Sequence, residues 1–284
     1  MSVANESTTI NMRIAASTYL NSAPLAFSFA AGQQRARATF LGDTAPSRCA
    51  RMLAQGQCDI ALIPVIEYQR IPNLRLIRNV AVACKSRIRS VVLASRCELS
   101  EARTITLDSA SRTAQALVKI LLARHYNNQP GYQERRVEPH AGCANMLEGS
   151  DAALVIGDPA FRLEAHAAET GLQIYDLAAE WRTMTGLPFV FAVWAVREDA
   201  LEDFHQTKLN FLEAKAEGLK HAEEIAAEYV KEIGLPHSEL LKYLSENVNY
   251  DLDEENLAGL QLYFQMAREC GLIDEARPLK FADD

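Results

Sequence analysis

The feature that most constrains the fold of this chain is a set of short, almost wholly apolar runs. Each run ends in a polar turn that leads into a helical stretch. The clearest run is DIALIPVIE at residues 59–67, and similar runs cover residues 12–16 and 152–156. A strand without polar alternation is typical of a parallel sheet that is covered on both faces. Repeated strand–turn–helix units of this kind predict an α/β protein.

The same patterns predict the remaining elements. Strands are expected in short apolar runs, several of them rich in β-branched and aromatic residues, at residues 74–84, 90–95, 104–107 and 189–196. Helices are expected where apolar positions recur at helical spacing, at residues 24–31, 45–55, 114–125, 198–233, 237–248 and 253–270. The last three ranges follow one another without a predicted strand, so the α/β part is expected to carry a helical C-terminal segment.

The chain is long enough for two lobes. Its 284 residues correspond to about two domains at roughly 150 residues each. The strand that ends at Ser95 and the strand that begins near Phe189 bracket a block that we expect to form an inserted lobe. The expected division is a first lobe from residues 12–95 and 190–284, a second lobe from residues 96–189, and a flexible N-terminus at residues 1–11. Two lobes joined by two crossings leave a cleft, where ligand sites usually lie.

Charge and composition exclude several classes of protein. The chain carries 29 basic and 37 acidic residues, a net charge of −8, and so lacks the basic footprint of a nucleic-acid-binding protein. No run approaches the roughly 18 apolar residues of a membrane span, and residues 1–11 lack the apolar core of a secretory signal. The six cysteines form no zinc-binding pattern and are expected to be reduced structural thiols. We therefore expect a cytoplasmic protein with a small-molecule ligand and with no nucleic-acid or membrane partner.

Four polar turns follow predicted strands and are the candidate ligand-binding positions. They lie at residues 17–22, around Ser90 and Ser95, at residues 109–113, and at Gly157–Asp158. In α/β sheets, the carboxyl ends of strands and the helix N-termini beyond them face the ligand crevice, and free N–H groups and hydroxyls there bind carboxylates. For any single turn, helix capping worth about 1 kcal/mol is the favoured alternative. Four such turns in one chain favour a ligand site, with which capping is compatible.

Asn21 and Arg112 are the most informative residues of these turns. The amide of Asn21 can donate and accept at once, which suits it to orient a substrate or hydrogen-bond a leaving hydroxyl; the alternative is an Asx turn before Pro24. Arg112 opposes the dipole at a helix start, which suggests that it faces an anion or an acidic side chain, the alternative being a solvated or ion-paired arginine. No metal cluster, carboxylate pair, serine–base arrangement or glycine-rich phosphate loop is found. These residues predict a two-lobed cleft protein for a small anionic ligand.

Six longer segments carry a family resemblance. They are TYLNSAPL (18–25), CDIALIPVIEY (58–68), SVVLASR (90–96), SRTAQALVKILL (111–122), DAALVIGD (151–158) and EWRTMTGLPFVFAVW (180–194). They resemble the chorismate dehydratase family of the futalosine route to menaquinone. The resemblance implies a two-lobed periplasmic-binding-protein-like fold of type II. It also implies that the chain removes water from chorismate to give 3-[(1-carboxyvinyl)oxy]benzoate, without a metal or an organic cofactor.

The resemblance also implies roles for individual residues. Asn21, in the YLN turn, is the expected catalytic residue near the leaving hydroxyl. The expected substrate-binding residues lie in the matching segments of both lobes: Tyr19, Ser22, Pro64, Ser90, Ser111, Arg112, Thr113, Gly157, Asp158, Thr185 and Gly186. No His or Glu general base occurs in the polar turns, so a carboxylate of the substrate itself is one candidate to take the proton.

The sequence departs from the family pattern at three places, and three other functions are alternatives to a chorismate dehydratase. The segment CKSRIR (84–89) is basic and lacks an expected glycine, Ala110 and Ala114 replace frequent hydroxyls, and Pro159 follows the GD pair. One alternative is the sister enzyme that acts on cyclic dehypoxanthinyl futalosine, against which EWRTMTGLPFVFAVW argues. Another is a non-catalytic solute-binding protein, which normally carries an export signal. The third, a ligand-sensing domain of a regulator, needs an attached DNA-binding unit that the sequence does not contain.

Overall fold

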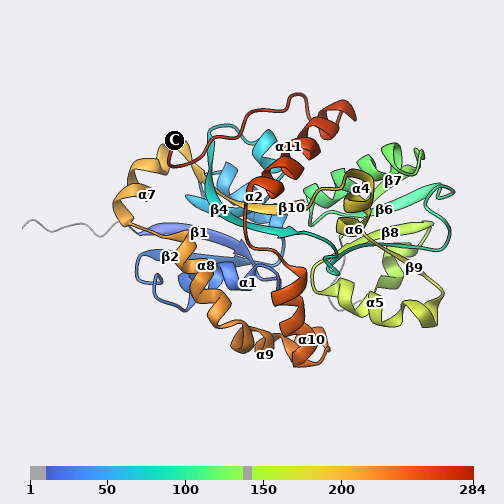
Figure 1. The fold of residues 1–284 in the computed structure, drawn as a ribbon, viewed down its shortest axis with the longest axis horizontal. Coiled ribbons are helices and arrows are strands. Elements are labelled where there is room, and N and C mark those ends of the chain that lie inside the picture. The colour runs from blue at the N-terminus through green and yellow to red at the C-terminus, as the bar shows by residue number, and fades with distance from the viewer. Residues whose placement is uncertain (1–10, 137–142) are drawn as a thin grey trace, which may run out of the picture.

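Two five-stranded sheets, lying side by side, form the two lobes of the molecule (Figure 1). The computed structural model describes residues 11–136 and 143–284, so the N-terminus predicted to be flexible lies outside the described residues except for Asn11. The first sheet has the order β2 (Ala38–Asp43), β1 (Met12–Ser17), β3 (Ile60–Pro64), β10 (Phe189–Arg197) and β4 (Leu74–Cys84). The second sheet has the order β7 (Gly131–Arg135), β6 (Thr104–Asp108), β8 (Ala152–Ile156), β5 (Val91–Ser95) and β9 (Gln173–Asp176).

One strand in each sheet runs against the others. In the first sheet β1 is parallel to β2 and β3, whereas β10 is antiparallel to β3 and β4 because it brings the chain back from the second lobe. In the second sheet β6 is parallel to β7 and β8, whereas β5, which brings the chain in, is antiparallel to β8 and β9. The parallel sheet predicted from the apolar runs is therefore a mixed sheet in both lobes.

The chain crosses between the lobes earlier than the sequence predicted. Strand β4 belongs to the first sheet and β5 to the second, so the first crossing covers residues 85–90 and not the residues after Ser95. Assigning residues 12–95 to the first lobe is therefore wrong for β5. A short apolar strand carries no mark of which sheet it joins, and only its pairing with β8 and β9 decides this.

Helices cover the sheets and form the C-terminal segment. The first lobe has α1 (Ala23–Ala30), α2 (Pro46–Ala54) and α3 (Glu67–Arg70), and the second has α4 (Arg112–Arg124), a 3₁₀ turn at Cys143–Leu147, α5 (Pro159–Thr170) and α6 (Leu177–Thr185). The C-terminal segment consists of a 3₁₀ turn at Glu198–Ala200, α7 (Leu201–Thr207), α8 (Phe211–Lys220), α9 (Ala222–Ile233), α10 (His237–Lys242), a π turn at Tyr243–Asn247 and α11 (Glu254–Glu269).

The helical C-terminal segment is confirmed but is more divided than expected. The stretch predicted over residues 198–233 is broken after α7, because Lys208 adopts a left-handed conformation with φ of 55°. Asn210 then caps α8, its side chain accepting the N–H groups of Leu212 and Glu213 at 3.1 Å. The cap predicted at Asp253 is confirmed, since its Oδ1 accepts the N–H of Asn256 at 2.9 Å.

The buried interior agrees with the apolar runs. All five residues of β3 and of β8 are buried, and Trp181 is fully buried with its indole N–H donating to the Pro188 carbonyl at 3.1 Å. Burial raises the pKa of the free thiols of Cys49 and Cys84 to about 12, so both stay protonated and behave as small apolar groups. In the described part of the chain, no helix has the length and apolar character to cross a membrane.

Candidate functional site

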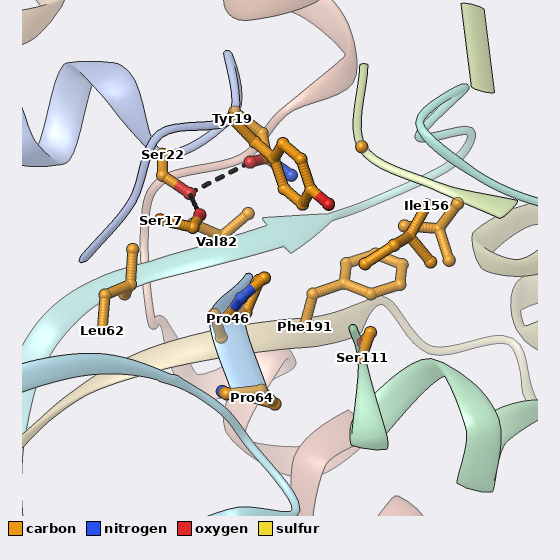
Figure 2. Close-up of a pocket in the computed structure, with 14 residues that line it drawn as sticks. Ser17, Tyr19, Ser22, Pro46, Leu62, Pro64, Val82, Ser111, Ile156 and Phe191 are labelled. Carbon is orange, nitrogen blue, oxygen red and sulfur yellow. Dashed lines mark hydrogen bonds between the residues drawn. The ribbon is translucent and has the colours of Figure 1, made fainter. Parts of the chain in front are cut away.

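A pocket lies between the lobes, near the carboxyl ends of β1, β3 and β8 (Figure 2). The first lobe contributes Ser17, Tyr19, Asn21, Ser22, Pro46, Leu62, Pro64, Val82, Phe191 and Ala192, and the second contributes Val91, Ser111, Ile156 and Gly157. The cavity measures about 40 Å³, far below the roughly 300–1,000 Å³ of ordinary ligand pockets. Together with the hydrogen bond from the Ser47 N–H in the first lobe to the Ala110 carbonyl in the second, at 3.1 Å, this small volume shows the two lobes closed on each other.

Four helix N-termini meet at this pocket, two from each lobe. Ser22 is the N-cap of α1 and Pro46 is the first residue of α2, while Ser111 is the N-cap of α4 and Gly157 lies two residues before α5. The partial positive charge of helix N-termini stabilises anions. α1, α2 and α5 contribute through this charge alone, because proline stands in the first turn of each and their other first-turn N–H groups already donate within the protein. In a chain with a net charge of −8, this convergence gives the pocket a local preference for a negatively charged ligand.

Asn21 lines the pocket and is hydrogen-bonded to Ser22, which in turn contacts Ser17. The Ser22 hydroxyl donates to Asn21 Oδ1 at 3.1 Å, and the Oγ atoms of Ser22 and Ser17 are 2.8 Å apart. Because Oδ1 already accepts a hydrogen bond, the Nδ2 amine of Asn21 is the group that remains to donate to a ligand. Ser17 belongs to the polar turn predicted at residues 17–22, but the sequence analysis did not single it out as a substrate-binding residue.

Tyr19 closes the pocket where the lobes meet. Its ring lies so near Gly157 that a Cβ built on this glycine would be 2.8 Å from two ring carbons. Gly157 also has a φ of +70°, a left-handed conformation that glycine adopts without strain. Both the backbone angle and the close approach of the ring require glycine at this position.

Asp158 joins the lobes beside the pocket without lining it. Its Oδ1 accepts the N–H of Leu20 at 3.1 Å, across the cleft. Burial raises the pKa of its carboxyl to about 7, and Glu232 adds to this, whereas the Leu20 N–H and Arg162 act in the opposite direction. The carboxyl therefore changes its charge near neutral pH and holds the turn that carries Asn21.

The structure brings about half of the predicted site residues together in the pocket. Those that line it are Tyr19, Asn21, Ser22, Pro64, Ser111 and Gly157. Two others form contacts that connect the lobes. Ser90 is buried, its carbonyl accepts the Gly157 N–H at 2.7 Å, and its Oγ accepts from the Tyr243 hydroxyl at 2.6 Å. The buried Oγ1 of Thr113 accepts the N–H of Ile66 at 3.2 Å.

The remaining three predicted residues lie away from the pocket. Arg112 is exposed and forms no ion pair with any residue that the structure describes, so the acidic partner suggested for it is not found there. Thr185 Oγ1 donates to the Trp181 carbonyl at 2.8 Å and accepts the Leu187 N–H at 3.1 Å. Gly186 ends α6 with a φ of 73°. Both residues form the turn that leads back to the first lobe.

The apolar residues of the pocket were not predicted from the sequence. Leu62, Val82, Ile156 and Phe191 form apolar walls, and each lies in or beside a strand whose residues are nearly all buried. An apolar side chain that faces a cleft has the same sequence signature as one that faces the core. No pattern in the sequence could separate the two.

Comparison with known proteins gives a family and a fold. The model of a family described as menaquinone biosynthesis matches residues 12–269. A chorismate dehydratase of Thermus thermophilus is 30% identical over 232 residues, which cover 77% of this chain and 83% of that protein.

Solved structures show the fold alone, because their sequence identities are low. A protein of Archaeoglobus fulgidus gives a TM-score of 0.71 at 19% identity, covering 93% of this chain and 98% of that one. A Candida albicans protein with the generic periplasmic-binding-protein fold gives 0.67 at 15% identity, covering 93% and 91%. The periplasmic aliphatic sulphonate binding protein of Escherichia coli gives 0.62 at 16% identity, covering 95% and 93%. The two-lobed periplasmic-binding-protein-like fold of type II is thus confirmed.

Proposed function

The chain belongs to the menaquinone biosynthesis family, and from this premise we propose that it converts chorismate into 3-[(1-carboxyvinyl)oxy]benzoate. We place this reaction in the futalosine route to menaquinone and in the cytoplasm. The identity to a chorismate dehydratase of Thermus thermophilus supports the reaction. The structural observation that supports it is the convergence of four helix N-termini on the pocket that holds Asn21, because chorismate carries two carboxylates.

The reaction requires little from the protein beyond positioning of the substrate. The C3–H and C4–O bonds of chorismate break, a C3–C4 double bond forms, water leaves, and the ring becomes aromatic. The C3 hydrogen is vinylogous to the ring carboxylate, and aromatisation supplies driving force. The protein then has to hold the dianion in one orientation and assist the departing hydroxyl.

Asn21 is suited to assist the hydroxyl, and the helix N-termini are suited to hold the carboxylates. The amide NH2 group of Asn21 can donate to this hydroxyl, while the Ser22 hydroxyl donates to Oδ1 and fixes the orientation of the amide. In α4, Ser111 Oγ accepts the Ala114 N–H at 3.3 Å, and the N–H groups of Arg112 and Thr113 in the same turn can donate to an anion. These contacts act on a substrate enclosed by both lobes.

The proton from C3 goes to a carboxylate of the substrate in this proposal. Among the described residues that line the pocket, Tyr19 is the single side chain with an acidic or basic group. Burial, with the nearby Asp108 and Asp158, raises the pKa of its hydroxyl far above neutral. Tyr19 therefore stays protonated and acts as a donor, which leaves the substrate as the source of a base.

The test is incubation of the purified protein with chorismate. We expect the aromatic enol ether to appear by ultraviolet absorbance and by mass spectrometry, and N21A to lose turnover while its thermal unfolding stays close to that of the wild type. Chorismate that binds tightly but is recovered unchanged indicates a solute-binding protein instead. Consumption of cyclic dehypoxanthinyl futalosine, with chorismate untouched, indicates the sister enzyme.

A further inference from the structure

The first crossing between the lobes contains a left-handed residue that is not glycine. Arg89 has a φ of 64°, in the left-handed region that residues other than glycine and asparagine rarely adopt. Its N–H donates to Asp176 Oδ2 at 2.6 Å, and the N–H of Ile88 donates to Oδ1 of the same carboxylate at 3.2 Å. Asp176 also caps α6, which leads to the second crossing. The turn at Arg89 is thus tied to both crossings.

The guanidinium of Arg89 joins two parts of the molecule. Its Nε is 3.0 Å from Glu164 Oε2 on α5, which packs on the second sheet. Its Nη1 is 3.1 Å from Glu239 Oε2 on α10, which belongs to the C-terminal segment. The Arg89 side chain is 18% exposed, whereas that of Arg87, which also pairs with Glu164, is 52% exposed.

Two short routes connect Arg89 to the pocket. The first is the backbone, since the next residue, Ser90, accepts the Gly157 N–H at 2.7 Å, and Gly157 lines the pocket. The second runs through rings, because the guanidinium lies 5.6 Å from the centroid of Phe161, and Phe161 meets Tyr243 edge-on at 4.8 Å. The Tyr243 hydroxyl then donates to Ser90 Oγ at 2.6 Å. Both routes pass through Ser90, whose carbonyl accepts the N–H of the pocket residue Gly157.

We propose that Arg89 is a positioning residue for the closed cleft. Its two ion pairs hold the left-handed turn, and the turn fixes Ser90 and thereby Gly157 against Tyr19. The helix N-termini of the two lobes then face one common space. Arg89 itself does not line the pocket, so it acts through Ser90 and Gly157 and not on the ligand.

Three variants separate the guanidinium from the backbone and from the fold. R89G removes the guanidinium, while glycine adopts the same φ without strain. R89K keeps a charge but lacks the planar fork that reaches two carboxylates. R87A is the matched control, because Arg87 shares the partner Glu164 and its Nε lies 3.8 Å from Asp176 Oδ2, but it is more exposed and has no left-handed backbone.

Two measurements test the role of Arg89. The measurement of kcat/KM for chorismate rests on the proposed function, whereas small-angle X-ray scattering of the ligand-free protein does not. We expect R89G to lower kcat/KM for chorismate about tenfold, because it removes two partly exposed ion pairs that are each worth up to about 1 kcal/mol, with R89K between R89G and the wild type. R87A should stay within about threefold, as for an exposed ion pair. Without ligand, R89G should have a larger radius of gyration than the wild type and R87A.

The two hypotheses fail in different ways. A wild-type protein that leaves chorismate unchanged refutes the proposed function, and the scattering comparison alone then decides the role of Arg89. R89G with the radius of gyration and kcat/KM of the wild type overturns the positioning role. So does an equal loss of activity in R89G and R87A that follows an equal fall in melting temperature, because Arg89 then supports only the stability of the fold.

Discussion

Asp158 is expected to make closure of the cleft depend on pH. Burial raises the pKa of its carboxyl from the ordinary 3.8 to about 7, with Glu232 on α9 adding to the shift. The N–H of Leu20 and the guanidinium of Arg162 on α5 oppose it. Tyr229 on α9 faces the same carboxyl, but its pKa is raised well above neutral and it stays protonated. Asp158 is therefore the group of this cluster that titrates near pH 7.

The direction of the effect follows from where the carboxyl is buried. The first lobe covers it only when the cleft is closed, so the closed form binds a proton more tightly than the open form. Protonation of Asp158 therefore favours closure below pH 7. This contribution to the free energy of closure is lost as the pH rises through 7. With pKa values of about 7 when closed and about 4 when open, the closure constant falls about tenfold between pH 6 and pH 8, or about 1.4 kcal/mol. Asp158 keeps part of its surface exposed, which makes this an upper value.

The assay is the KM for chorismate at pH 6, 7 and 8 in the wild type and in D158N. Asparagine can still accept the Leu20 N–H, but it does not titrate. We expect the KM of the wild type to rise up to about tenfold over this range and that of D158N to stay flat. D151N is the matched control, since Asp151 accepts the N–H groups of Arg103 and Thr104 within the second lobe. A KM that rises equally in D158N and in the wild type refutes the reasoning.

Three further substitutions test the site and its supports. S22A frees the amide of Asn21 to rotate and should lower kcat about fivefold, for one lost hydrogen bond of about 1 kcal/mol, in steady-state assays at saturating chorismate. G157A places a Cβ 2.8 Å from the Tyr19 ring and strains the backbone by about 1 kcal/mol, so ligand-free scattering should show a more open molecule. D176A leaves four backbone N–H groups without their acceptor and should lower the free energy of unfolding by about 1–3 kcal/mol in urea titrations.

The strands of both sheets could be predicted only where they are apolar. β3 and β8 are buried along their whole length and therefore form uninterrupted apolar runs. β2, β7 and β9 are edge strands and are mostly exposed or half-buried. Water therefore replaces the packing that would have selected apolar residues there. The lobe to which β5 belongs depends on pairing across the chain, which local patterns do not encode.

The turns of the site could be predicted, but the direction of their side chains could not. Asn21, Ser111 and Gly157 line the pocket because each follows a strand that points at the cleft. Ser90, in the first crossing, and Thr113, in the first turn of α4, carry similar hydroxyls, yet their side chains are buried in hydrogen bonds to Tyr243 and to the backbone of Ile66. A polar side chain near a strand end can bind the ligand or form a contact between the lobes. Which of the two it does depends on residues far away in the sequence.

The distribution of charge explains why an acidic chain can enclose an anion. Among the described residues that line the pocket there is no lysine, arginine or histidine, so the positive potential comes from α1 and α2 in one lobe and from α4 and α5 in the other. Each open lobe presents only half of this potential to water, where it is screened. A ligand with two carboxylates gains most when both halves face it in a closed, drier cleft. The substrate therefore favours the closed form that its own reaction needs, and no permanently charged side chain is required to attract it.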